Sequence, residues 1–179
     1  MSSQRGDYDE LIRPVEAQMM RAVWRIAQNA DDADDAFQDA TATIWAKIAR
    51  VRAHRNPQAL ILRICINAAC DLVRKKSRRA CRETPLTEAH VVADSSFDGT
   101  ASLRAKEQRD MVARAIARLP ERQAAAVTMR ILLERPYSEI ADALGCAEAT
   151  ARVHVSNGLQ RLRSALDRLN AIPSEEDRR

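Results

Sequence analysis

The sequence contains few of the residues on which β-sheet proteins and metal sites depend. Aromatic residues make up 3% of the 179 residues and there are only 4 glycines, which argues against an all-β fold. The 4 cysteines include no Cys-x-x-Cys pair and the 3 histidines are scattered, so the ligand spacing of a zinc site is missing. Neither a P-loop nor a nucleophile elbow occurs. We expect no catalysis, metal, cofactor or small-molecule substrate.

Long apolar segments are also missing. The most apolar stretch, ALILRICINAAC, is interrupted by Arg63 and Asn67 and is too short to span a bilayer. The first residues, MSSQRGDYDE, lack the apolar core of a secretory signal. Cys65 and Cys70 lie within the apolar stretch, where a free thiol behaves as a small buried hydrophobe. We therefore expect a cytoplasmic protein with reduced cysteines and no membrane attachment.

Residues that favour helices are abundant, and apolar side chains recur at spacings of three and four. Helices are predicted over residues 10–29, 31–51, 58–79, 102–119, 120–134, 137–144 and 147–169. Between them, one segment mixes Pro, Ser, Thr, Asp and Gly without periodicity, as a linker does. The sequence therefore predicts an all-α fold of two small helical domains, 9–80 and 102–170, with a linker over 81–101 and a polar tail over 171–179. A linker of roughly twenty residues would reach about 66 Å when extended, so the domains could lie well apart.

Charge is distributed unevenly along the chain, whose formal net charge is +4. Four aspartates crowd the start of the helix 31–51, where acidic residues suit the positive end of the helix dipole. The helix 58–79 ends in a basic run, with no acidic residue from Leu72 through Arg82. Polar residues four apart lie on one face of this helix, which predicts a largely buried helix with one polar edge: Arg63, Asn67, Asp71 and Lys75. Such a pattern suits a polyanionic partner without requiring one.

Residues 137–169 have the pattern of a helix-turn-helix. Two helices are separated by a tight turn at Gly145, and the second would bury a stripe formed by Ala151, Val155, Leu159, Leu162 and Leu166. In a DNA reader the opposite face enters the major groove, where arginine suits guanine, asparagine suits adenine and glutamate suits cytosine. The residues expected to contact DNA are Glu148, Ala149, Arg152, Val153, Ser156, Asn157 and Arg161. A helical hairpin with a solvated face is the alternative.

The motifs LPERQ, YSEIADALG and TARVHVSNGLQRLR resemble region 4 of the extracytoplasmic-function (ECF) sigma factors. Upstream, DADDAFQDATATIWAKI and ALILRICINAACDLVRKKSRR resemble region 2 of the same family, in the same order. The resemblance covers about residues 9–169. It implies a non-enzymatic subunit of bacterial RNA polymerase that recognises the −10 and −35 promoter elements.

The resemblance also implies a role for particular residues. Region 2 would dock on the clamp helices of the largest polymerase subunit through Asp34, Asp35, Gln38, Asp39 and Trp45. It would capture the opened −10 strand through Arg52, His54, Arg55, Asn56, Arg63, Asn67, Arg74, Lys75 and Arg78. Region 4 would read the −35 element through the helix 147–169. The family commonly pairs with an anti-sigma factor, so such a partner is expected as well.

Five positions depart from the family pattern. Leu60 stands where an aromatic platform is usual, and Pro136 where Ser or Thr is usual. Ala147 stands where a polar N-cap is usual, and Asn157 where a basic residue is common. Gly158 replaces an alanine, at a helix-propensity cost of about 1 kcal/mol.

Two other functions fit parts of the sequence. A helix-turn-helix regulator would use the same reading module but would need neither an acidic docking helix nor a melting helix. A sigma mimic that sequesters an anti-sigma factor would lose the basic charges of residues 74–82, which this chain keeps.

Overall fold

The computed structural model describes residues 6, 8–83 and 99–170. Every regular element within these residues is helical, which confirms the all-α fold predicted from the sequence. The middle of the predicted linker (84–98) and the predicted tail (171–179) lie outside the described residues. The flanking helices run to Glu83 and from Gly99, so each extends into the segment predicted as linker.

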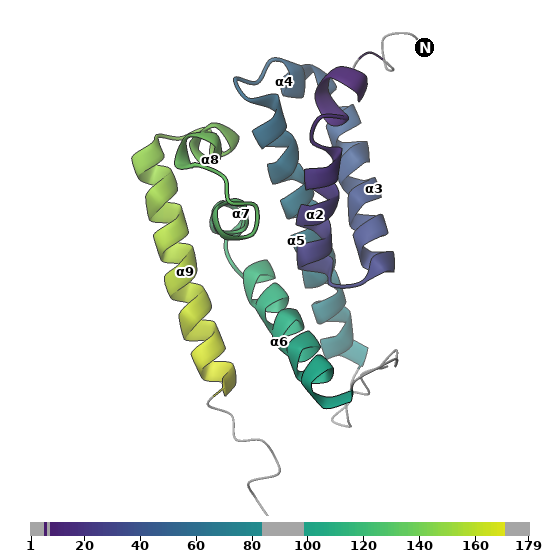
Figure 1. Cartoon of the computed structure of the whole chain (residues 1–179), viewed down its shortest axis with the longest axis vertical. Helices are drawn as coiled ribbons and strands as arrows, with labels where there is room; N and C mark the ends of the chain where they lie inside the picture. The colour runs from purple at the N-terminus through teal and green to yellow at the C-terminus, as the bar shows by residue number, and fades with distance from the viewer. Residues whose placement is uncertain (1–5, 7, 84–98, 171–179) are drawn as a thin grey trace, which may run out of the picture.

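The first half of the chain forms a helical bundle (Figure 1). The predicted helix 10–29 is divided into a π-helical turn, η1 (Tyr8–Ile12), and the helix α2 (Glu16–Ala27). The division lies at Arg13–Val15 around Pro14, whose ring removes a backbone donor. The predicted helix 31–51 is also divided, at Lys47, and its last part ends at Arg52, one residue beyond the predicted bound. The elements are η1 (Tyr8–Ile12), α2 (Glu16–Ala27), α3 (Ala30–Ala46), α4 (Ile48–Arg52) and α5 (Pro57–Glu83).

Two asparagine side chains start the long helices of this bundle. Asn29 Oδ1 accepts a hydrogen bond from the Asp32 N–H at 2.9 Å, at the start of α3. Asn56 Oδ1 accepts from the Ala59 N–H at 3.1 Å, at the start of α5. Asparagine is a favoured N-cap because its oxygen satisfies a donor that the helix leaves unpaired. The proline that follows Asn56 lies at the first helical position, where it is tolerated best.

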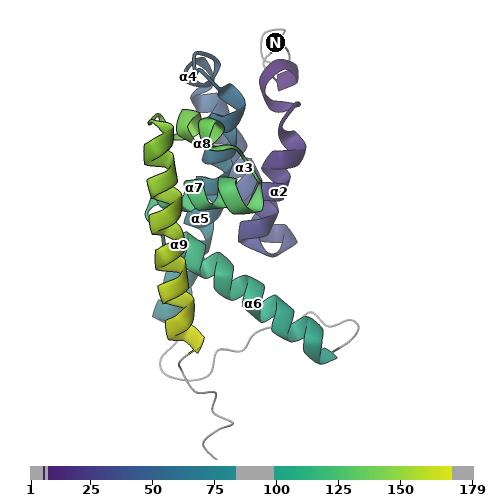
Figure 2. The same cartoon turned by 60° about the vertical axis from the view of Figure 1, so that its left-hand side comes forward.

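The second half forms a smaller helical unit. Its elements are α6 (Gly99–Ala117), α7 (Glu121–Val127), the π-helical turn η2 (Thr128–Leu132), α8 (Tyr137–Leu144) and α9 (Glu148–Asn170). The structure confirms the predicted bounds of α8, which ends at Gly145 with a φ of 62°. Glycine adopts this left-handed conformation without the steric penalty of other residues. After this sharp turn α9 packs against both α8 and α7, and Figure 2 shows it crossing them at a steep angle.

Helix α5 lies at the centre of the molecule (Figure 1). It packs against α2 and α3 on one side and against α6, α7 and α8 on the other. The buried side chains of both halves form one continuous cluster. The linker length allowed separate domains, but in this structure the two halves are in contact.

The buried cysteines behave as the sequence predicts. Cys65 and Cys70 are buried in α5, and burial raises the pKa of each thiol to about 12. Both therefore stay protonated and unreactive near neutral pH. The described residues contain no cluster of three or more His, Cys, Asp or Glu side chains suited to a metal ion. None of the helices in the described ranges has the length and hydropathy needed to cross a membrane.

Candidate nucleic-acid and protein interfaces

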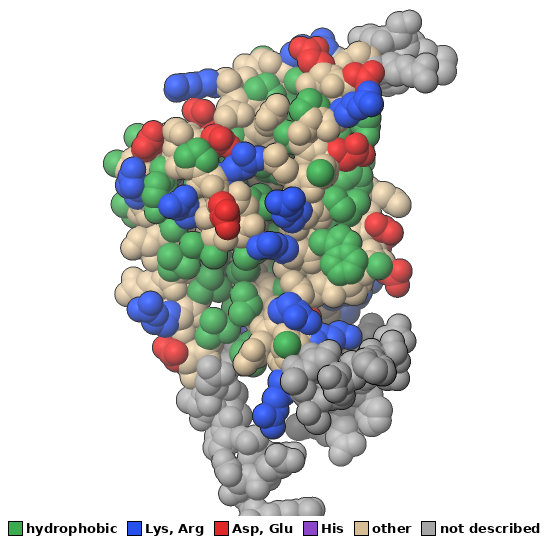
Figure 3. Space-filling model, viewed as in Figure 1, with side chains coloured by type: hydrophobic (Ala, Val, Ile, Leu, Met, Phe, Trp, Pro, Cys, Tyr) green, Lys and Arg blue, Asp and Glu red, His purple; other side chains and the backbone are tan. Residues whose placement is uncertain are grey.

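The acidic residues of α3 divide into an outward group and an inward one. Asp34, Asp35, Gln38 and Asp39 are exposed, and acidic side chains line the edge of the molecule on the side of α2 and α3 (Figure 3). Asp32, which is 5% exposed, instead forms an ion pair with Lys76 of α5.

Asp32 fixes α3 against α5 through this ion pair, so only the exposed residues of α3 are available to a partner. The sequence alone did not distinguish Asp32 from its neighbours, because the pairing depends on how α3 packs on α5. Trp45, the last of the predicted docking residues, is half-buried and packs against the core.

The basic loop before α5 is held by its own side chains. His54 Nδ1 lies 2.9 Å from the Asn56 carbonyl oxygen and 3.1 Å from the Asn56 N–H, while the Asn56 side chain caps α5. These two predicted strand-binding residues therefore also shape the loop. The Asn-Pro pair is itself a sequence signal for a capped helix start. Arg52 and Arg55 are exposed at this end of the bundle.

Part of the polar edge of α5 faces the second half of the chain: Arg63 and Asn67 are half-buried there, whereas Lys75 is exposed. Glu121, in the first turn of α7, accepts hydrogen bonds from Asn67 Nδ2 at 2.7 Å and from an Arg63 guanidinium nitrogen at 3.1 Å. Arg63 also donates to the Ala143 carbonyl oxygen at 3.1 Å, near the end of α8. The sequence predicted a largely buried helix with one polar edge, and the structure adds that this edge contacts the second half of the chain. The sequence analysis missed Glu121 because that residue lies 54 positions from Asn67 and belongs to the other half of the chain.

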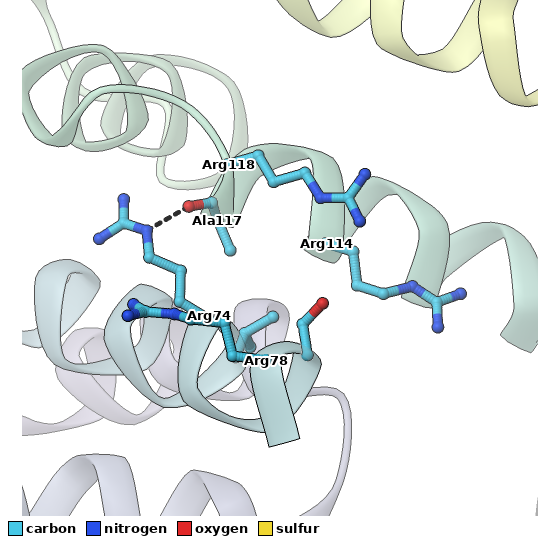
Figure 4. A pocket seen from close by; sticks show the side chains of 7 residues that line it. Arg74, Arg78, Arg114, Ala117 and Arg118 are labelled. Carbon is cyan, nitrogen blue, oxygen red and sulfur yellow. Dashed lines mark hydrogen bonds between the residues drawn. The ribbon is translucent and has the colours of Figure 1, made fainter. Parts of the chain in front are cut away.

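The basic end of α5 makes a second contact with the other half. Arg74 donates hydrogen bonds to the Ala117 and Leu119 carbonyl oxygens, the latter at 3.0 Å, at the C-terminal end of α6. Figure 4 shows Arg74 of α5 reaching to Ala117 of α6 beside a pocket of about 440 Å³, whose lining also includes Arg114 and Arg118. A guanidinium at a helix C-terminus satisfies carbonyl groups that have no partner within the helix. Lys75 and Arg78 are exposed.

The predicted reading face of α9 is exposed along its length. Val155 and Leu162 are buried as expected, but Leu159 is 40% exposed, so its assignment to the buried stripe was wrong. Gly158 takes the inward position instead: it is buried and faces Val127 and Gln123 of α7. All the side chains predicted to contact DNA are exposed: Glu148, Ala149, Arg152, Val153, Ser156, Asn157 and Arg161.

Arg152 is held in place on this face. Its guanidinium carbon lies 4.2 Å from the centre of the Tyr137 ring, and a guanidinium nitrogen lies 3.7 Å from a Glu148 carboxylate oxygen. Arg130 lies over the same ring at 5.0 Å. Cation–π contacts of this kind orient the guanidinium without hiding its donors. The sequence analysis assigned no role to Tyr137, since its contact with Arg152 depends on the angle between α8 and α9.

Gly158 allows the close approach of α9 to α7. A Cβ atom at this position would lie 2.5 Å from Val127 Cγ2 and 3.4 Å from the Gln123 carbonyl oxygen. Val127 is 2% exposed and its β-branched side chain is stiff in a helix. Glycine is therefore required by packing, and the helix-propensity cost inferred from the sequence is only part of its effect.

Comparisons with known proteins match both halves of the chain. The family described as sigma-70 region 2 matches residues 11–79, and the family described as sigma-70 region 4 matches residues 109–162. The ECF RNA polymerase sigma factor SigM from two strains of Mycobacterium tuberculosis is 30% identical over 170 residues, which span 95% of this chain and 82% of SigM.

A solved structure supports the fold. The sigma factor RpoE of Bartonella quintana, crystallised with the anti-sigma factor NepR, matches with a TM-score of 0.52 at 22% identity, over 90% of this chain and 97% of RpoE. The resemblance inferred from the sequence is thus confirmed for both regions and in their order. The chain belongs to the ECF sigma factors of RNA polymerase, a family of transcription initiation factors and not of enzymes.

Proposed function

We propose that this sigma factor docks on core RNA polymerase through α3 and holds promoter DNA at two points, the −10 element through region 2 and the −35 element through α9. The observation that carries the proposal is that one chain presents an exposed acidic face on α3 and an exposed reading face on α9. A simple helix-turn-helix regulator would need only the second face. The protein acts in the cytoplasm, catalyses no reaction itself, and has an anti-sigma factor as its regulator.

Docking uses charge complementarity with the clamp helices of the largest polymerase subunit. Asp34, Asp35, Gln38 and Asp39 form the contact, and Trp45 supports the end of α3 from within the bundle. Complementary charge speeds association and excludes wrong partners. Asp32 is not part of the contact, because its carboxylate is already paired with Lys76.

Strand capture at the −10 element uses the basic loop and the polar edge of α5. Arg52, His54, Arg55 and Asn56 receive a flipped base, and the energy spent on unstacking it is offset by contacts to the unpaired strand. The remaining strand contacts come from α5: Arg63, Asn67, Arg74, Lys75 and Arg78. Leu60 offers no aromatic platform, so hydrogen bonds and charge carry this contact.

At the −35 element, Arg152 reads a base. The substitution Arg152→Ala is expected to lower discrimination at one −35 position by about 1–3 kcal/mol, because a bidentate contact to guanine is lost. The measurement is a binding titration of the protein with a set of single-base variants of the −35 duplex. Arg163→Ala serves as the control. Arg163 is exposed farther along α9, where we expect it to contact phosphate, and loss of a phosphate contact weakens binding to all sequences equally. Uniform weakening by Arg152→Ala would show that Arg152 contacts phosphate instead.

The proposed function as a whole is tested by transcription in vitro. Purified core polymerase is mixed with the full chain and with genomic DNA fragments of the source organism, and run-off transcripts are measured. We expect new transcripts and co-elution of the chain with core polymerase. Absence of both would refute the proposal, and duplex binding without co-elution would favour a helix-turn-helix regulator.

A further inference from the structure

The ring of Tyr137 connects the packed part of region 4 with the exposed reading face of α9. Tyr137 is the first residue of α8, is half-buried, and packs against the core. The guanidinium carbon of Arg152, in α9, lies 4.2 Å from the centre of this ring. The arginine predicted to read a base therefore rests on an aromatic side chain of the other helix of the helix-turn-helix.

Neighbouring contacts fix the position of this ring. Arg130 of η2 places its guanidinium carbon 5.0 Å from the ring centre and donates a hydrogen bond to the Arg135 carbonyl oxygen at 3.2 Å. The Arg135 guanidinium forms an ion pair with Glu139 of α8 at 3.4 Å. Pro136 comes directly before Tyr137 with a φ of −67°, which the proline ring restricts. The start of α8 is thus tied to η2, and Tyr137 offers Arg152 a fixed surface.

Arg152 has little else to hold its side chain in one orientation. The side chain is 59% exposed, and its ion pair with Glu148, at 3.7 Å, joins two exposed groups and is screened by solvent. A bidentate contact to guanine needs the planar guanidinium in one orientation, and an arginine that is ordered only on binding loses much rotamer freedom. Packing on a fixed ring removes part of that freedom before DNA binds, so less is lost in the complex.

We propose that Tyr137 is a positioning residue for base recognition, whose ring orients the Arg152 guanidinium toward a base edge in the major groove. The inference rests on the proposed base contact of Arg152 and deepens it. A guanidinium stacked on a ring keeps its N–H donors at its edge, where a base can accept them. Tyr137 itself selects no base, so its loss lowers discrimination only at the position that Arg152 reads.

The test measures base preference with a library of DNA duplexes that have a randomised central segment. The full chain selects from the library, and the bound duplexes are sequenced. Arg152→Ala is expected to lower the preference at one position about tenfold. Tyr137→Leu, which removes the ring and keeps an apolar side chain, should lower the preference at the same position about threefold. Tyr137→Phe keeps the ring and should change this preference by less than about twofold.

A preference between two sequences does not depend on the fraction of chains that fold, so partial unfolding of Tyr137→Leu cannot produce the expected result. Weaker binding by Tyr137→Leu with unchanged preferences, or an equal loss of preference for Tyr137→Phe, would overturn the positioning role. In both cases the base contact of Arg152 would stand if Arg152→Ala still lost its preference. No loss for Arg152→Ala would refute that base contact, and the positioning role with it.

A double variant gives the second readout. Because Tyr137 acts through Arg152, Tyr137→Leu combined with Arg152→Ala should lower the preference at that position no further than Arg152→Ala does alone. A further loss at the same position would show that Tyr137 contacts the base itself, and would overturn the proposal.

Discussion

Charge reversal of Asp34 and Asp35 to lysine is expected to weaken binding to core polymerase by about a hundredfold. Both side chains are exposed on the acidic face of α3, and like charges brought together at an interface cost several kcal/mol. The free energy of unfolding should change little, since neither residue belongs to the core. The measurement is a titration of labelled protein with core polymerase, followed by fluorescence anisotropy.

The matched control for this reversal changes net charge equally. Glu107 and Asp167 are exposed on α6 and α9, and their double replacement by lysine should leave polymerase binding within about twofold. Binding of an isolated −35 duplex should survive the α3 reversal. The docking assignment fails if the α3 variant keeps its affinity for polymerase and loses its affinity for the duplex.

The second large effect is expected at Gly158. Helix propensity alone predicts that Gly158→Ala stabilises the protein by about 1 kcal/mol. The new Cβ atom, however, would lie 2.5 Å from Val127 Cγ2, and overpacking of a filled core costs about 1–3 kcal/mol. We expect the clash to prevail and the free energy of unfolding to fall by about 1–2 kcal/mol in a urea titration.

A double-mutant cycle identifies the cause of that loss. Val127→Ala creates room beside position 158, so the double variant Val127→Ala, Gly158→Ala should be more stable than the sum of the two single effects predicts. Additive effects would mean that the clash with Val127 is not the reason for glycine. A gain in stability for Gly158→Ala alone would contradict the packing account altogether.

Local signals in the sequence were sufficient for the helix-turn-helix. The bounds of α8 follow from Pro136 and Gly145, whose backbone preferences act on their immediate neighbours. The exposed face of α9 follows from the spacing of its apolar residues. Only Leu159 was misassigned, because Gly158 has no side chain to mark it as buried.

Contacts between the halves of the chain were not predictable in this way. Asp32 looked like its acidic neighbours until the packing of α3 on α5 brought it to Lys76. Glu121 looked like an ordinary acidic residue at a helix start, yet it binds Asn67 and Arg63 across the two regions. Such pairings depend on tertiary geometry, and a single sequence carries no spacing rule for them.

The proposal that this sigma factor holds promoter DNA at both the −10 and the −35 element is tested most directly by mapping where transcription starts. Core polymerase with the full chain transcribes genomic DNA, and the 5′ ends of the transcripts are sequenced. The account predicts start sites that share two upstream elements at a fixed separation, and it predicts that altering either element lowers transcription from that site. Start sites that share only one element, or transcripts no different from those of core polymerase alone, would contradict it.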